Sequence, residues 1–306
     1  MANNALQENL SIRFRKLLTG DPNGVPPWLE VVAAGDEAGF FLPSDAPWVV
    51  HADFGTLVGG IRALLMQALH PGSLTGVKNH SRYEKDPLGR LSGTIRWLTV
   101  TTFGSKTAVA NEANRVNRLH DRVTGAYETG TGQTVPYRAA DDDLLLWVHI
   151  AFMESFLVSH QMYSRKNIPA GKFPTGADNY VNTWSVSVKP LGLEKVPMSL
   201  SELENEITCI YDRGLLANTD DTLRVVEFIK NPPLPNGAKP VYRLLFDAAV
   251  LSLRPEFRAL LGLKAKPRWL IQPITRQLLR FMRFAIGPES PIEEASINRL
   301  RRIGAI

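Results

Sequence analysis

The chain has 306 residues, an apolar fraction of 44% and one cysteine, Cys209, which together exclude a wholly disordered protein, an intramolecular disulfide and any metal site built from several cysteines. The formal net charge is +5, and residues 251–306 alone carry eleven Lys/Arg against four Asp/Glu, which is +7. A basic segment of this kind is most often a solvated helical face, and because no basic–aromatic binding module accompanies it, we expect no nucleic-acid partner.

The first predicted element is a helix over residues 58–69, which are apolar almost all round, as in a buried helix. We expect this helix to stop at His70, because a residue before proline is pushed out of the α region. Residues 70–83 then join it to the next helix. The two histidines of this connection, His70 and His80, either line a pocket wall or cap helix ends.

Residues 88–103 predict the second helix, with two distinct faces. Arg90, Thr94, Trp97 and Thr101 share one face, and Leu91, Ile95 and Leu98 form the apolar face. The first face suits a pocket for an anion, or a solvated arginine over a half-buried indole.

Residues 106–123 predict the third helix, with Ser105 as its N-cap and Gly125 as its stop. The apolar stripe of this helix follows spacings of four and three through Val109, Ala113, Val116, His120 and Val123. The arginines of the helix form a separate stripe. His120 therefore faces the core, where a neutral imidazole is either a metal ligand or a satisfied core group.

The longest predicted helix covers residues 144–163 and is long enough to cross a bilayer. It contains His149, Glu154 and His160, and because charged groups at bilayer depth are costly, a buried core helix is the better interpretation. The polar N-terminus lacks the order of a secretory signal, so we expect a cytoplasmic protein. His149 and His160 lie roughly 16 Å apart along this helix, too far to share a metal, so His149 is a core hydrogen-bonding group or part of a pocket wall.

Further helix signals follow in the C-terminal half. Ser199 with Glu202 is a helix-start pattern, and a cap at 219–220 opens a helix that must end before Pro232. Residues 185–188 alternate as a short strand does, but such stretches are few. We therefore predict a mainly α protein with few or no strands, a single large helical domain over 1–306 with a buried central helix. Its parts are an N-terminal extension (1–45), a core (46–265) and a basic helical C-terminal segment (266–306).

Several catalytic motifs are missing from the chain. It has no phosphate-binding G-x-x-x-x-G-K-[ST], no dinucleotide-binding G-x-G-x-x-G after a strand, no H-E-x-x-H and no G-x-S-x-G. No histidine has a glutamate three residues before it, as a di-iron bundle requires. A redox role therefore needs a single axial histidine that holds a bulky cofactor.

A set of short motifs in a fixed order resembles one family, the MpaB/latex-clearing-protein (rubber oxygenase) family. The motifs are WVVHAD (48–53), LVGGIRALLMQALHP (57–71), GV (76–77), HS (80–81), RLSGT (90–94), LHDRVTG (119–125), LWVH (146–149), RP (254–255) and GL (262–263). The resemblance implies a mostly helical fold that binds haem b through one histidine and uses dioxygen. It places the iron ligand at His120 and sets Arg90 and Thr94 beside the haem, with His70, His80 and His149 as further pocket candidates.

The chain departs from the rubber oxygenases at three positions. They carry a lysine before the matching threonine, where this chain has Gly93. They carry a glutamate about sixteen residues before the arginine, and residues 74–79 contain no acid; they carry an arginine four residues after the histidine, where this chain has Thr124.

The resemblance predicts a haem b oxygenase acting with dioxygen on a small apolar substrate. One alternative is a non-catalytic binder of lipid-like or terpenoid molecules that has lost the haem. Another is a membrane-surface or acidic-partner module that uses Arg276, Arg280 and Arg283 beside apolar neighbours.

Overall fold

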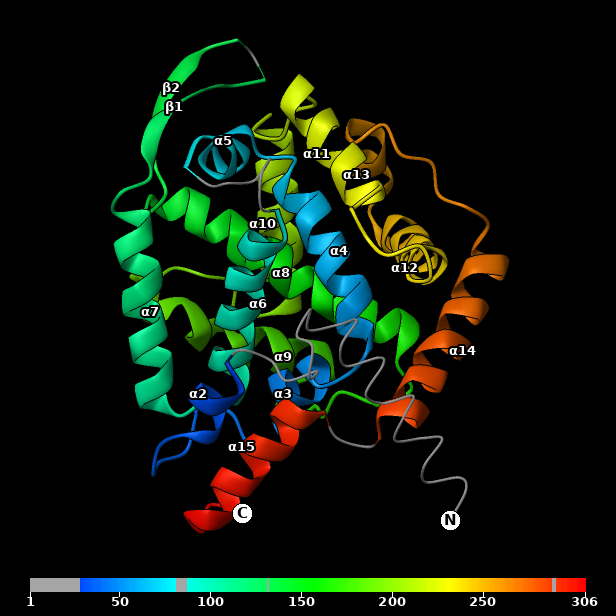
Figure 1. Cartoon of the computed structure of the whole chain (residues 1–306). Helices are drawn as coiled ribbons and strands as arrows, with labels where there is room; N and C mark the ends of the chain where they lie inside the picture. The colour runs from blue at the N-terminus through cyan, green and yellow to red at the C-terminus, as the bar shows by residue number, and fades with distance from the viewer. Residues whose placement is uncertain (1–27, 81–86, 131, 288–289) are drawn as a thin grey trace.

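The computed structural model describes residues 28–80, 87–130, 132–287 and 290–306, with their side chains except those of 76–80, 87–92 and 286. The predicted mainly α fold is confirmed: the described elements are helices apart from one small hairpin (Figure 1).

The helices before the hairpin are α2 (Leu29–Ala33), α3 (Ala46–His51), α4 (Gly55–Gln67), α5 (Pro71–His80), α6 (Pro87–Phe103) and α7 (Lys106–His120). The hairpin consists of β1 (Thr124–Glu128) and β2 (Thr134–Arg138). The helices that follow are α8 (Asp142–Tyr163), α9 (Gly176–Trp184), the 3-10 helix η1 (Ser185–Leu191), α10 (Leu200–Asp212), α11 (Asp220–Lys230), α12 (Lys239–Ser252), α13 (Pro255–Leu260), α14 (Arg268–Ile286) and α15 (Pro291–Arg302).

The predicted start signals act as expected. The hydroxyls of Ser105, Ser199 and Thr219 each accept a hydrogen bond from the backbone N–H three residues later, at the starts of α7, α10 and α11. α11 ends at Lys230, before Pro232, as predicted.

The connection predicted over 70–83 is wrong in its first part, because residues from Pro71 onwards form α5. Proline suits the first position of a helix, where no intrahelical partner exists for its missing N–H. His70 closes the start of this helix: its carbonyl accepts from the N–H of Leu74 at 2.9 Å, and its Nδ1 accepts from the N–H of Ser73 at 3.4 Å.

The helix predicted over 106–123 ends early, at His120, and the chain continues into the hairpin. β1 and β2 pair antiparallel with Gly125 opposite Tyr137. Gly125 is therefore part of a strand and does not stop a helix. A Cβ at Gly125 would lie 3.0 Å from the Tyr137 ring, so the glycine leaves room for the tyrosine to cross the hairpin.

The strand considered over 185–188 is also wrong, because these residues lie in the 3-10 helix η1. Ser187 and Val188 are both buried although they are adjacent, whereas adjacent residues of a strand point to opposite faces. η1 ends at Gly192, whose φ of +92° favours glycine.

The centre of the core is the crossing of α4 and α8 (Figure 1). The two helices approach closely at Gly59, where a Cβ would lie 2.6 Å from Cδ1 of Phe156 and 3.2 Å from the carbonyl oxygen of Ser155. Glycine is thus needed at position 59 for backbone packing. The predicted buried helix 58–69 corresponds to α4, whose Val58, Leu65 and Met66 are all buried.

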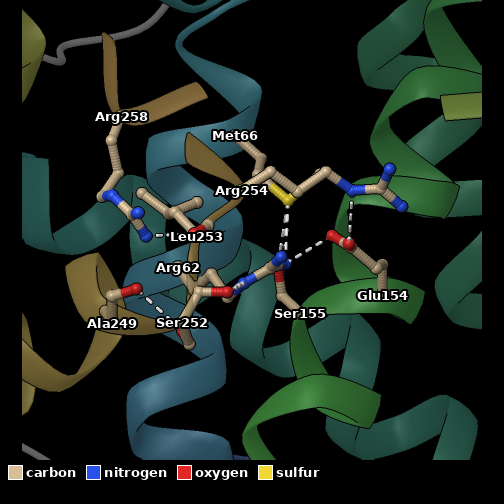
Figure 2. A network of polar contacts seen from close by, with 9 residues as sticks. All are labelled: Arg62, Met66, Glu154, Ser155, Ala249, Ser252, Leu253, Arg254 and Arg258. Atoms are coloured by element: carbon tan, nitrogen blue, oxygen red, sulfur yellow. Dashed lines mark hydrogen bonds and ion pairs between the residues drawn. The ribbon is translucent and has the colours of Figure 1, made fainter. Parts of the chain in front are cut away.

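Buried ion pairs connect α4 and α8 to the segment after α12 (Figure 2). The Arg62 side chain on α4 is 1% exposed, and its Nη1 lies 2.6 Å from Oε2 of Glu154 on α8. Arg254 completes the cluster, with its Nε 3.1 Å from Oε1 of the same carboxylate. Burial alone raises the pKa of Glu154, but the charges and hydrogen bonds of the two arginines outweigh it and hold that pKa below its ordinary value.

Arg62 makes further contacts through Nη1 and Nε. Its Nη1 donates to Oγ of Ser155 at 2.8 Å and reaches Sδ of Met66 at 2.9 Å, while its Nε donates to the carbonyl of Ser252 at 3.3 Å (Figure 2). Glu154, noted in the sequence as a charge that argues against a membrane span, is therefore one partner in a core ion pair. Among the described helices, none combines the length and apolarity that a bilayer crossing requires.

Part of the basic C-terminal segment is buried. Arg299 on α15 is 1% exposed and donates to the carbonyls of Val32 on α2 and Phe103 on α6. The expected solvated face therefore does not include this arginine, which fixes α15 against the start of the described chain.

Candidate functional site

α6 and α7 form an antiparallel helical hairpin. One contact between the two helices shows which of their residues lie at the same height along the hairpin. Nε of Arg96 on α6 lies 2.9 Å from Oε2 of Glu112 on α7. Arg90 is six residues before Arg96, a rise of roughly 9 Å, and His120 is eight residues after Glu112, roughly 12 Å. The two predicted site residues therefore lie at the same end of the hairpin.

The polar face of α6 points inward. On the apolar face, Leu98 packs against the core, whereas Ile95 is 40% exposed. Trp97 and Thr101 lie on the opposite side of the helix from Ile95; Trp97 is half-buried and Thr101 is fully buried. Thr94 is half-buried and is one turn from Trp97 on this side. By position, Arg90 belongs to the same face.

Burial of the predicted α7 stripe decreases towards its histidine. Val109 is 0% and Ala113 2% exposed, whereas Val116 and His120 are half-buried. His120 is the last residue of α7. The stripe thus runs from the core to a less buried end, where the imidazole lies.

Open space and an unpartnered hydroxyl occur along the same α6 face. A Cβ at Gly93 would meet no heavy atom within 4 Å. Deeper in, Oγ1 of Thr101 is buried and has no hydrogen-bond partner within the described chain. Buried hydroxyls are normally satisfied, so this atom is a candidate contact for a ligand.

His51, which the sequence reasoning did not single out, closes the deep end of this face. Its Nδ1 lies 2.8 Å from Oγ1 of Thr102 and its Nε2 lies 2.8 Å from the Tyr180 hydroxyl. The Thr102 hydroxyl gives its one proton to the carbonyl of Leu98, so it must accept from Nδ1–H, and Tyr180 must donate to Nε2. Desolvation lowers the pKa of His51 to about 3, which fits this neutral tautomer.

His149 is the second neutral buried histidine. It is 4% exposed, its Nε2 has no hydrogen-bond partner in the described structure, and desolvation lowers its pKa to about 3. It lies seven residues before Phe156 on the same face of α8, and the Phe156 ring centroid is 5.0 Å from that of His51. His149 is therefore roughly 10 Å nearer the start of α8 than this contact.

The start of α8 and the end of α7 meet. The N–H of Ala139, just after β2, donates to the carbonyl of Val123 at 2.9 Å. His120 and His149 thus both lie towards the end of the molecule at which α6 and α8 begin and α7 stops.

The other predicted histidines are placed differently. His70 is 1% exposed, between the rings of Tyr127 and Trp147, with ring centroids 6.0 and 6.3 Å away. Burial lowers its pKa against an opposing effect of Asp143. His80 is the last residue of α5, and its side chain lies outside the described residues, as does that of Arg90.

A surface cleft of 720 Å³ lies on the other side of α7, lined in part by Arg96, Glu112, Arg115 and Glu37. Glu112 joins the two arginines across it, with Nη2 of Arg115 at 2.6 Å. The His120 stripe does not line this cleft.

The chain was compared with family models, curated proteins and solved structures. Residues 48–285 match the model described as ER-bound oxygenase mpaB/B'/Rubber oxygenase, catalytic domain. The chain belongs to this family. No curated protein matches the chain. No solved structure matches it.

The match to the oxygenase family begins within α3 and ends within α14, so it includes the whole α6–α7 hairpin, α8 and the histidines discussed above. The structure shows the surroundings of two of the positions at which the sequence departs from the rubber oxygenases. Gly93 leaves space where rubber oxygenases carry a lysine, and Thr124 is an exposed residue of β1.

The residues that sequence reasoning missed are those whose partners are far away in the chain. His51 interacts with residues 51 and 129 positions later, and Arg62 pairs with a carboxylate on α8. Both lie in motifs that resemble the oxygenase family, WVVHAD and LVGGIRALLMQALHP, and a polar residue within an apolar motif was the available signal.

Proposed function

We propose that this chain is a haem b-dependent, oxygenase-like enzyme that acts with dioxygen on a small apolar substrate, unsaturated or terpenoid-like in character. The observation that carries the proposal is that Arg90 and His120 lie at a similar height along the α6–α7 hairpin, at the same end of it. This end lies within the region that matches an oxygenase catalytic domain.

The residues at this end fit a porphyrin held by one histidine. His120 lies on the inward stripe of α7, and it is half-buried where the stripe opens. The inward face of α6 offers the half-buried Thr94 and Trp97, open space at Gly93 and the unpartnered hydroxyl of Thr101. A large planar group binds between apolar side chains with a few polar ones among them, and these residues supply both kinds.

Each residue has a distinct task in this proposal. His120 binds the iron through a neutral ring nitrogen, as single-histidine haem sites do. Arg90 pairs with an anionic propionate, and Thr94, one turn further on, adds a hydrogen bond. When bound, haem supplies the oxidising chemistry with dioxygen.

The surrounding residues exclude water and select the substrate. In this proposal the half-buried side chains of Trp97 and Val116 shield the haem from water, and His149 contributes a neutral polar atom to an otherwise apolar interior. A lining of this kind favours a small apolar substrate. His70 and His80 are lower-ranked members of the pocket wall.

The test is reconstitution of the purified chain with haem, followed by absorption spectroscopy. We expect a Soret band and one haem per chain, with His120→Ala weakening haem binding at least about tenfold. The matched control is Arg118→Ala, an exposed residue on the same helix. Added imidazole should restore the spectrum of a folded His120→Ala variant. An unchanged Soret band in His120→Ala contradicts the ligand assignment.

A second candidate function is a non-catalytic binder of lipid-like or terpenoid molecules. It is favoured by the three departures from the rubber oxygenases, namely Gly93, Thr124 and the lack of an acid in 74–79. This function predicts a colourless protein that binds apolar ligands. A pyridine haemochrome assay that finds one haem per chain excludes it.

A further inference from the structure

The cleft beside α7 is separate from the residues assigned to the haem. Its volume is 720 Å³, which falls within the range of small-molecule sites, roughly 300–1,000 Å³. Its lining comes from α2, the connection after α2, α6 and α7, and in Figure 1 α2 lies at the end of the α6–α7 hairpin where α7 begins. The lining includes three arginines, Arg96, Arg115 and Arg118, and three small apolar residues, Val31, Ala34 and Ala108.

A buried carboxylate fixes two of these arginines. The Glu112 side chain is 1% exposed. Its Oε2 accepts from Nε of Arg96 at 2.9 Å, and its Oε1 accepts from Nε and Nη2 of Arg115 at 2.9 and 2.6 Å. Burial alone raises the pKa of Glu112, but the hydrogen bonds and charges of the two arginines outweigh it and hold that pKa below its ordinary value. Both guanidinium groups are therefore held in place by a charged partner.

Each of the three arginines keeps N–H groups that face no partner within the described chain. The side chains of Arg96 and Arg115 are 35% and 32% exposed, and both Nη atoms of Arg96 and Nη1 of Arg115 make no hydrogen bond to a described residue. Arg118, one turn further along α7, is exposed and has neither a hydrogen bond nor an ion pair there. Guanidinium groups with free N–H pairs bind carboxylate and phosphate oxygens well.

Positive charge is in excess at the arginine end of the cleft, where three arginines face one carboxylate. The other two acids of the lining lie near the start of α7. Glu37 accepts from the backbone N–H and the hydroxyl of Thr107, both at 2.6 Å, and Thr107 is eight residues before Arg115, roughly 12 Å along the helix. Asp36 lies 3.8 Å from Arg302. Neither acid neutralises the arginine end.

We propose that this cleft binds a small organic oxyanion, a carboxylate or a phosphate monoester on a short apolar body. The head group is bound by Arg96, Arg115 and Arg118. The body extends along α7 towards Ala108, which lies seven residues before Arg115, roughly 10 Å, and it packs against Val31 and Ala34. The His120 stripe lies on the other side of α7, so the site is independent of haem binding.

The experiment is isothermal titration calorimetry of the purified full chain with hexanoate, hexyl phosphate and hexylammonium. We expect at least one of the two anions to bind with a dissociation constant of about 1 mM or lower, and the tighter one identifies the head group. Hexylammonium should not bind. Arg118→Gln should weaken binding of the anion about tenfold. The matched control is Arg165→Gln, which removes another exposed arginine outside the cleft.

A second pair of variants tests the cleft without changing its charge. Asn111 is exposed and lines the cleft, so Asn111→Trp should fill it and weaken binding of the anion at least about tenfold. Ala110→Trp is the control, because Ala110 is exposed on the same helix but is not part of the lining. Circular dichroism checks that both variants are folded.

Three results would overturn the proposal. The first is that neither anion binds to the wild-type chain. The second is that hexylammonium binds as tightly as the anions, because the arginines then do not select the charge. The third is that the folded Arg118→Gln and Asn111→Trp variants bind the anion as tightly as wild type, because binding then takes place elsewhere.

Discussion

The α4–α8 crossing and the open end of the α6–α7 hairpin use polar groups in opposite ways. At the crossing, Arg62 and Glu154 are enclosed, and their charges are met by each other, by Arg254 and by neighbouring oxygens. At the hairpin end, polar side chains on the inward faces are half-buried, and there is open space beside Gly93. A buried network of paired charges holds helices together, whereas an incompletely filled polar surface is available to a ligand. Substitutions in the two regions should therefore have different effects.

The largest effect is expected for Glu154→Ala. Removing the carboxylate leaves Arg62 as a buried charge without its partner, which costs about 3–5 kcal/mol of unfolding free energy. Urea unfolding followed by circular dichroism measures the loss. Glu204→Ala, on the exposed side of α10, is the control and should change the stability by less than about 0.5 kcal/mol. Equal stability of the two variants would show that the network does not fasten the helix pair.

Acidification should destabilise the protein through its buried neutral histidines. The folded pKa of His51 and of His149 is about 3, below the unfolded value of about 6.5. Between these values the unfolded chain binds protons that the folded chain does not bind. The contribution of the two histidines to the free energy of unfolding is therefore complete above pH 6.5 and is lost as the pH falls towards 3. At pH 5 each histidine should cost about 2 kcal/mol.

Comparing unfolding free energies at pH 7 and pH 5 checks this prediction. His149→Gln should reduce the difference by about 2 kcal/mol, because glutamine does not titrate. A variant with the same pH dependence as wild type would contradict the assignment of a neutral buried imidazole at position 149.

Three glycine substitutions separate the tight region from the open one. Gly59→Ala should cost about 1–3 kcal/mol, because its Cβ would lie 2.6 Å from Cδ1 of Phe156. Gly60→Ala on the same helix and Gly93→Ala on α6 meet no heavy atom within 4 Å and should each stabilise by about 0.5–1 kcal/mol, because alanine favours the helix. Thermal unfolding distinguishes these signs. A destabilising Gly93→Ala would mean that the hairpin end is filled.

Local signals predicted much of the fold. Caps at Ser199 and Thr219 and the stop before Pro232 depend only on neighbouring backbone groups, and all three were predicted from the sequence. α5 was missed because its composition, rich in Gly, Ser, Thr and Asn, lacks an apolar period. Its start depends on His70, and a Cβ on its Gly72 would lie 2.7 Å from the Tyr127 ring of β1, so α5 requires a contact that sequence patterns do not contain.

The candidate site could be predicted only in part for a similar reason. Spacing alone placed Arg90 and Thr94 on one face of a helix, but which face points inward depends on packing, and Ile95 proved to be exposed. The equal level of Arg90 and His120 follows from the antiparallel hairpin. The hydrogen bonds of His51 join three helices, α3, α6 and α9, and no local pattern encodes such a meeting.

Arg299 has a practical consequence for protein engineering. Its guanidinium holds α15 against both Val32 near the start of the described chain and Phe103 at the end of α6. Removing the last helix to shorten the chain for expression would therefore also remove the hydrogen bonds that hold α2 and the end of α6. A fusion tag placed after Ile306, which is 52% exposed, leaves the hydrogen bonds of Arg299 in place.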